Sequence, residues 1–327
     1  QTDTTGDNIT LTTESGTITV DAAGSGVNTV GSGSISLTAG GSTKQIAVNK
    51  AISGTTGGIT LSADGAITNS AAGTISQSGA GNISVTSTSA NIAQNGDVTS
   101  AGGQISYSAG TSIAMADGKK ASSLIVGNTG AVSFTAAQAI TVSLIEAGGT
   151  ISLTATNGTL TVGNAVTAGG SGTVGLTATG AGNDVILNGA TGSTTGNITV
   201  NDDRNIAINT GGDITTAGNV TLNAAQGGST GTITESGTGK VLTAALLTTV
   251  SDGGQTLNNA NTVASFNATN TTGGAISLTN LRNTPVEIEV VRHVLGNIGD
   301  AGQEGEADMV NALEDDDYLP QGRPAWW

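Results

Sequence analysis

The amino-acid sequence predicts an all-β protein built as a parallel β-helix, and three observations support this fold. A short unit of alternating apolar and small polar residues recurs along the chain, successive units lie close together, and residues 1–283 contain no proline. Alternation with a period of two residues is the pattern of a β-strand that buries one face. The short distance between units leaves no room for a helix between consecutive strands.

The repeated unit reads approximately Gly-x-Ile/Val-x-Leu/Val-Thr. Copies include GDNITLT from Gly6, GGITLSA from Gly57, GGTISLTA from Gly148 and GGAISLTN from Gly273. Glycine, asparagine and aspartate separate the copies, and these residues tolerate the positive φ angles of tight turns. Each copy therefore predicts one short strand with a turn on either side.

The spacing of the units limits the topology. The apolar residues Ile59, Ile67, Ile75 and Ile83 follow one another at intervals of eight residues. This rhythm fits either an antiparallel meander of short hairpins or a parallel β-helix with about three strands per coil. At about 20 residues per coil, residues 1–283 would form about 14 coils.

The composition favours the parallel β-helix over the meander. The chain holds only two Phe, two Tyr and two Trp among its 327 residues, and a narrow solenoid filled by aliphatic rows needs no large aromatic core. Its many Thr, Ser and Asn residues suit ladders of like side chains that stack from coil to coil. Proline is poorly tolerated in stacked strands, because nearly every backbone N–H group there donates a hydrogen bond.

The composition changes near Thr284 and predicts two regions. Residues 1–283 form the parallel β-helix repeat domain, and residues 284–327 form an acidic C-terminal cap or assembly tail. The tail holds ten acidic and two basic residues, all three prolines and both tryptophans. Within it, VEIEVVRHVL from Val286 alternates as a final strand would, and EADMVNAL from Glu306 has the spacing of a short helix.

Charge and cysteine content exclude several function classes. The net charge is −15, which opposes binding to nucleic acid or to an anionic membrane. The chain has no cysteine, so disulfide scaffolds and thiolate metal sites are excluded. No apolar run is long enough for a membrane-spanning helix. We expect no metal and no cofactor, and we expect the protein not to be an enzyme.

Few residues in the repeats suggest catalysis. The densest charge cluster there is Asp202, Asp203 and Arg204. Polysaccharide-cleaving enzymes use clustered carboxylates for acid and base catalysis, but they also need further basic and aromatic residues, which are not evident here. We therefore expect a turn with a surface ion pair. The single histidine, His293, lacks evident partners for a triad or metal site, which favours a structural role.

Other motifs have equally simple interpretations. GAGNDVIL from Gly180 loosely resembles a calcium-binding nonapeptide, but the next nine residues do not repeat it, which favours a plain turn. The acidic run Glu314–Asp317 lacks the ligand pattern of a calcium loop, so we expect it to form a solvated face. Lys119 and Lys120 are expected to lie in a solvated turn. Seven Asn-x-Ser/Thr sequons are either glycosylation sites or chance matches in a chain rich in these residues, and they lie at Asn8, Asn82, Asn157, Asn197, Asn219, Asn267 and Asn270.

The succession of GxITL and GxISLT units resembles the repeat region of filamentous-haemagglutinin-like exoproteins, the secreted adhesins of two-partner secretion systems in Gram-negative bacteria. The resemblance covers residues 6–283, and its most specific block runs from Gly231 to Asn280. It implies a right-handed parallel β-helix, an outer-membrane export partner and a secreted protein at the cell surface. It also implies a role in adhesion or in a biofilm matrix.

The C-terminal residues suggest a contact with a partner or with the protein itself. Trp326 and Trp327 would be costly to leave in water, and we expect them, with Tyr318 and Leu319, to make assembly or partner contacts. Folding back over the open end of the solenoid and disorder are the alternatives. Two functions follow for the chain: a rigid rod for attachment or matrix, or a subunit that assembles head to tail into a filament. A polysaccharide-active enzyme is a minor third.

Overall fold

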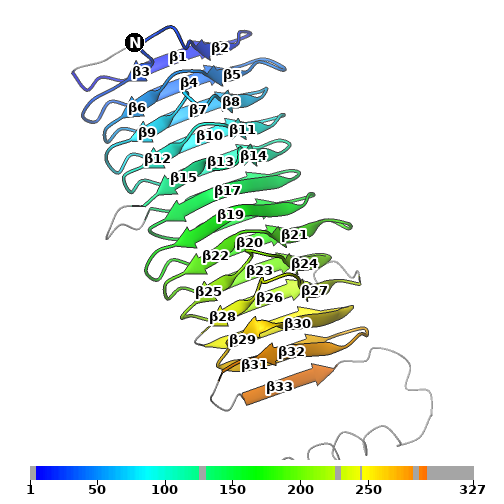
Figure 1. Cartoon of the computed structure of the whole chain (residues 1–327). Helices are drawn as coiled ribbons and strands as arrows, with labels where there is room; N and C mark the ends of the chain where they lie inside the picture. Colours follow the sequence, from blue (N-terminus) through cyan, green and yellow to red (C-terminus); the bar gives the residue numbers. More distant parts are fainter. Residues whose placement is uncertain (1–4, 125–129, 225–229, 244, 283–286, 293–327) are drawn as a thin grey trace, which may run out of the picture. The chain divides into compact units, whose positions relative to one another are not determined.

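The computed structural model of the protein describes residues 5–124, 130–224, 230–243, 245–282 and 287–292, with the side chains of 287–292 left out. The described residues form strands and connecting turns, without a helix. Strands pair in parallel with strands of the next coil, so the predicted parallel β-solenoid is confirmed and the antiparallel alternative is wrong. The coils stack in sequence order from β1 to β33 (Figure 1).

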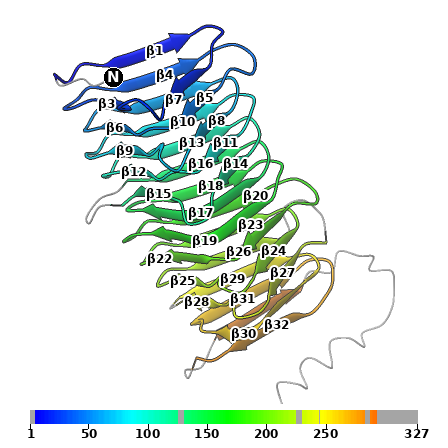
Figure 2. The ribbon, with the colours of Figure 1, turned by 45° about the horizontal axis from the view of Figure 1, so that its top comes forward.

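The solenoid has three faces, and each coil contributes a strand to most of them. The first face is a separate sheet of 13 strands, which Figure 2 shows stacked on one side of the molecule. Its strands are β1 (Ile9–Thr13), β4 (Ile35–Ala39), β7 (Ile59–Ala63), β10 (Ile83–Ser87), β13 (Ile105–Ala109), β16 (Val132–Ala136), β18 (Ile151–Ala155), β20 (Val174–Ala178), β23 (Ile198–Asp202), β26 (Val220–Ala224), β29 (Leu246–Ser251), β31 (Ser265–Asn270) and β33 (Glu287–Arg292).

The second and third faces together form a sheet of 20 strands. The second face contains β2 (Ile18–Val20), β5 (Ile46–Val48), β8 (Ile67–Asn69), β11 (Ile92–Gln94), β14 (Ile113–Met115), β21 (Asp184–Leu187), β24 (Asn205–Ile208), β27 (Thr232–Glu235), β30 (Gly254–Asn261) and β32 (Ile276–Asn280). The third face contains β3 (Val27–Asn28), β6 (Ile52–Gly54), β9 (Ile75–Gln77), β12 (Val98–Ser100), β15 (Lys120–Ser123), β22 (Ala190–Ser193), β25 (Ile214–Thr216) and β28 (Val241–Thr243).

Two long strands join the second and third faces. β17 (Ile140–Ala147) and β19 (Leu160–Ala168) each run through the corner between these faces, where the other coils of the middle region have two separate strands. The pairing of β17 with β19 shifts by one residue between Val142 and Leu144, which marks a bulge at the corner. A bulge bends a strand while keeping most of its ladder intact.

The coils are longer and less uniform than predicted. A coil takes 24 residues from Ile35 to Ile59, but 19 from Val132 to Ile151 and 27 from Ile105 to Val132. The estimate of about 20 residues per coil was therefore too low, and residues 1–283 contribute 12 described strands to the first face, where about 14 coils were expected. The predicted eight-residue rhythm itself is confirmed, because Ile59, Ile67, Ile75 and Ile83 each begin a strand.

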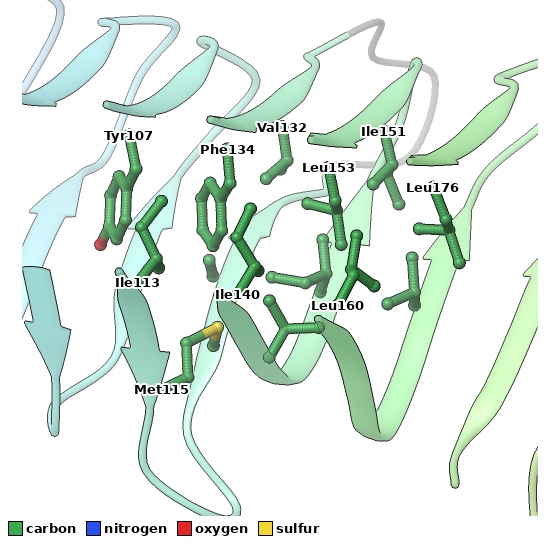
Figure 3. Packing of buried hydrophobic residues seen from close by; sticks show 14 of the residues in the cluster. Tyr107, Ile113, Met115, Val132, Phe134, Ile140, Ile151, Leu153, Leu160 and Leu176 are labelled. Carbon is green, nitrogen blue, oxygen red and sulfur yellow. The ribbon is translucent and has the colours of Figure 1, made fainter. Parts of the chain in front are cut away.

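The core is a continuous column of inward side chains. On the first face most strands bury their first, third and fifth residues, such as Ile151, Leu153 and Ala155, while the second and fourth face outward. Two of the few aromatic residues occupy equivalent inward positions in consecutive coils: Tyr107 and Phe134 stack with ring centroids 4.3 Å apart (Figure 3). Burial of each large apolar side chain stabilises the folded state by about 1.5–3 kcal/mol.

A repeated corner explains why glycine precedes the strands of the first face. Ser193 is buried, and its Oγ donates to the carbonyl oxygen of Gly172 at 2.6 Å and accepts from the Gly196 N–H group at 3.0 Å. A Cβ atom on Gly196 would lie 2.1 Å from that same carbonyl oxygen. The close approach of consecutive coils therefore requires glycine here. Ser100 makes the same pair of contacts, with Gly81 and Gly103.

The solenoid extends beyond the boundary drawn from composition. The compact unit to which it belongs spans Gln1–His293, and the last strand, β33, begins at Glu287. The final strand expected from VEIEVVRHVL is therefore present. Within the described part of the chain, no helix has the length and apolar character needed to cross a membrane.

Candidate functional site

Among the described residues, a dense group of charged side chains lies at the corner between the first and second faces. The two motifs singled out in the sequence, NDDRN and GAGNDVIL, meet there because they belong to consecutive coils. Asp184 of β21 pairs in register with Asn205 of β24. The two residues lie about one coil apart in the sequence, and the stacking of the coils brings them into contact. We call Asp184, Asp202, Asp203, Arg204 and Asn205 the acidic corner.

A bidentate ion pair connects the two coils of the acidic corner. Arg204 donates from Nε to Oδ1 of Asp184 at 2.7 Å and from Nη2 to Oδ2 at 2.6 Å. Asn205 adds an Nδ2 hydrogen bond to the same Oδ1 at 3.0 Å. The contact with Asp184 raises the pKa of the Arg204 guanidinium. The predicted ion pair therefore exists, but its acidic partner comes from the preceding coil and not from the adjacent aspartates.

Asp202 lies inside the solenoid, not on its surface. It is the fifth residue of β23, with 0% of its surface exposed, at the position where β20 has Ala178. Oδ1 accepts the Arg204 N–H group at 2.8 Å, whereas Oδ2 has no hydrogen-bond partner. Burial raises the pKa of this carboxyl to about 7, with smaller contributions from the charges of Asp184 and Asp203. The expectation of a purely surface cluster is wrong for this residue.

A second partly buried carboxylate lies one coil further along, at Glu235 in β27, which pairs with Ile208. Its Oε2 accepts the Asn259 N–H group at 2.8 Å and Nδ2 of Asn261 at 3.1 Å, while Oε1 has no hydrogen-bond partner. Burial raises the pKa of Glu235. Sequence reasoning missed this residue, although an acid at the fourth position of β27, where β21 has Leu187 and β24 has Ile208, was a usable signal.

The acidic corner has the chemistry of a junction between coils. Glycosidic cleavage needs two carboxyl groups that reach a substrate from either side, whereas Asp202 is fully buried and Asp184 is held by Arg204 and Asn205. Asp203 Oδ2 accepts the Gly180 N–H group of the preceding coil at 2.6 Å. Among the described residues, no group of three or more His, Cys, Asp or Glu side chains is placed to hold a metal ion.

The two lysines and several sequons have structural contacts. The Lys119 N–H group donates to the carbonyl oxygen of Ala116 at 3.1 Å within the expected turn, and Lys120 begins β15. Four sequon asparagines are exposed, and each accepts a backbone N–H group of the next coil through Oδ1, at 2.9 to 3.3 Å; they are Asn8, Asn82, Asn197 and Asn219. These side chains stabilise the stack, which accounts for their recurrence without glycosylation.

Several predicted residues lie outside the described part of the chain. These are His293, the acidic run Glu314–Asp317 and the four expected contact residues Tyr318, Leu319, Trp326 and Trp327. Their roles stay predictions.

Comparison with protein-family models, curated proteins and solved structures found no match for this chain. The likeness to filamentous-haemagglutinin-like adhesins therefore stands on the repeat motifs, together with the parallel β-solenoid that those motifs form.

Proposed function

We propose that the protein is a non-enzymatic extracellular rod that serves in surface attachment or in a biofilm matrix. The observation that carries this proposal is the first face, a single sheet whose 13 parallel strands keep one register from β1 to β33. A solenoid with an unbroken ladder and a continuous apolar core resists bending and separates whatever is attached at its ends. The charged clusters fit the same role, because they connect one coil to the next.

The resemblance to two-partner secretion adhesins supports the extracellular location. A chain without cysteine folds the same way in oxidising and reducing surroundings. The repeat motifs, the parallel solenoid and the absence of cysteine are the properties expected of a secreted rod at the surface of a Gram-negative bacterium.

Removal of one whole coil tests the rod function. Ile151 pairs with Val174, so deletion of residues 151–173 joins two equivalent positions and keeps the register. The shortened protein should fold, should be shorter by about one strand spacing of 4.8 Å, and should still mediate attachment of coated beads to cells or to a biofilm. Deletion of residues 151–161 breaks the register and should prevent folding.

Loss of attachment by a folded, coil-deleted protein would overturn the spacer role, because it would place a specific binding site in that coil. Turnover of an acidic glycan by the intact protein would overturn the non-enzymatic role.

Head-to-tail assembly is a second candidate, because the strands of the first face pair in parallel and in one register from β1 to β33. A ladder of this kind can be continued by the parallel strands of another copy. Electron micrographs should then show fibres of uniform width, and deletion of residues 319–327 should abolish them if the tail clasps the joint. Short rods of one length would contradict this assembly.

A further inference from the structure

The outer surface of the first face differs from the other two faces. Most of its strands present two outward residues, and β29 and β31 present three. From β1 to β31 these residues are Ser, Thr or Asn, with Gly175, Leu246 and Val250 as the exceptions. None of them is buried. We call this surface the hydroxyl face. From β1 to β31 it contains no charged side chain, whereas Asp184 lies on a strand of the second face, and Lys120 and Glu146 lie on strands of the third face.

The hydroxyl face is regular as well as uncharged. None of the pairings from β1 to β31 shifts register, so the outward side chains form two straight columns. Neighbours along a column are about 4.8 Å apart and the columns about 6.6 Å apart. The sheet of Figure 2 therefore carries a lattice of small hydroxyl and amide groups along the described coils.

An uncharged face of this size is unusual on a protein of net charge −15. Solvated surfaces normally carry about 25–35% charged residues, while the centres of protein interfaces are depleted of charge. Over the whole length from β1 to β31, the hydroxyl face is the one of the three described faces whose strands carry no charged outward residue. Two copies can therefore meet along it without bringing charged strand residues together.

The dimensions also fit a second copy. Twelve strands of about five residues give a face of roughly 50 by 17 Å, so two such faces would bury about 1,700 Å² in total, which lies within the range of stable protein interfaces. Flat β-surfaces of small polar residues interdigitate in dry interfaces between paired sheets. A contact between identical faces is two-fold symmetric, and it closes at two copies instead of growing.

We propose that two copies of the protein pair side by side through their hydroxyl faces, as a closed dimer. This inference rests on the proposed structural function, since a paired rod would be the building block of the matrix. It differs from head-to-tail assembly in the surface used and in its limit of two copies.

Substitutions on two faces of the same coils test the pairing. Ser106→Lys/Ser152→Lys places two charges on the hydroxyl face, on β13 and β18 with β16 between them. Ala114→Lys/Thr161→Lys is the matched control, with outward positions on β14 and β19 of the second face and β17 between them. Analytical ultracentrifugation of the full chain over a range of protein and salt concentrations gives the mass in solution.

Wild type and the control should sediment with about twice the 31.5 kDa chain mass, and the hydroxyl-face variant should be a monomer with an unchanged circular dichroism spectrum. Added salt should strengthen the wild-type dimer, because it screens the net repulsion while the interface has no charges to screen. A single cysteine at Ser152 should form an intermolecular disulfide far faster than one at Thr141, since the chain has no other cysteine.

A monomeric wild type would overturn the proposal, and so would a hydroxyl-face variant that dimerises as the control does. A monomer that co-sediments with insoluble cellulose, and loses this binding in the hydroxyl-face variant, would assign the face to neutral polysaccharide instead. A monomeric rod that still mediates attachment after removal of one coil would leave the proposed function standing, so the two failures are distinguishable.

Discussion

The coils from β13 to β20 and those from β23 to β31 share one backbone plan but differ in what fills them. In the earlier group the inward residues of the first face are all apolar and include the stacked pair Tyr107 and Phe134. In the later group the same columns contain Asp202, Thr249 and Asn270. Some of these polar side chains have an oxygen without a hydrogen-bond partner. The alternating rhythm therefore specifies the coil, while the inward residues set how stable each coil is.

Truncation in the two groups should expose this difference most clearly. Phe134 is 0% exposed and Thr249 occupies the same column several coils later. Phe134→Ala should lower the free energy of unfolding by about 3–5 kcal/mol, because it leaves a cavity in a packed core. Thr249→Ala removes one hydrogen bond to Gln255 and should cost about 1–2 kcal/mol. Urea denaturation monitored by circular dichroism measures both, and equal losses would contradict the contrast.

The buried carboxyl of Asp202 should make the later coils sensitive to pH. Its pKa is about 7 in the folded protein against 3.8 when unfolded, so between these values the folded state binds the proton more tightly. The free energy of unfolding should therefore fall as pH rises from about 4 to about 7, by roughly 2–4 kcal/mol, and level off above. Asp202→Asn keeps the shape and should flatten this slope.

Three other charged groups and Glu235 bear on the same measurement. Asp184 and Asp203 raise the pKa of Asp202, and Arg204 donates its backbone N–H group to it. Glu235 is shifted in the same direction and should leave a residual slope in the Asp202→Asn variant. Glu14→Gln is a suitable control, because Glu14 is an exposed acid. An identical slope in wild type and Asp202→Asn would show that Asp202 is not the responsible group.

A smaller effect is expected at the repeated corner, which both groups of coils share. Ser193→Ala leaves the carbonyl oxygen of Gly172 and the N–H group of Gly196 without their partner, and should lower the free energy of unfolding by about 1–3 kcal/mol. Ser171→Ala, at an exposed serine in the turn before β20, should change it by less than about 0.5 kcal/mol. Thermal unfolding of the two variants side by side makes the comparison.

The strands and their parallel stacking could be predicted from the sequence, because the apolar residues recur at regular intervals. Ile59, Ile67, Ile75 and Ile83 begin four successive strands, as the spacing indicated. The eight-residue rhythm with three strands per coil already implied a coil near 24 residues, which the estimate of about 20 overlooked. The irregular coils of 19 and 27 residues could not be foreseen, because corner loops carry no periodic signal.

Only part of the acidic corner could be predicted from the sequence. Asp202, Asp203 and Arg204 stood out as neighbours, but the partner of Arg204 is Asp184, which lies 20 residues earlier and one coil away. Finding it requires the register between coils, and that register depends on loop lengths. The burial of Asp202 follows from the same alternation that places Ile198 and Val200 inside, so it was open to prediction once β23 was recognised to extend to residue 202.

The strands β17 and β19, which pass through a corner without a break, bear on how the molecule comes apart. A stack of coils loses its outermost members first, since each contacts only its neighbours. Fraying from either end should slow on reaching the coils that these two strands hold closed. The amide protons of β17 and β19 should then exchange with deuterated solvent last of all. The coils that contain these two strands would be the most resistant to local unfolding.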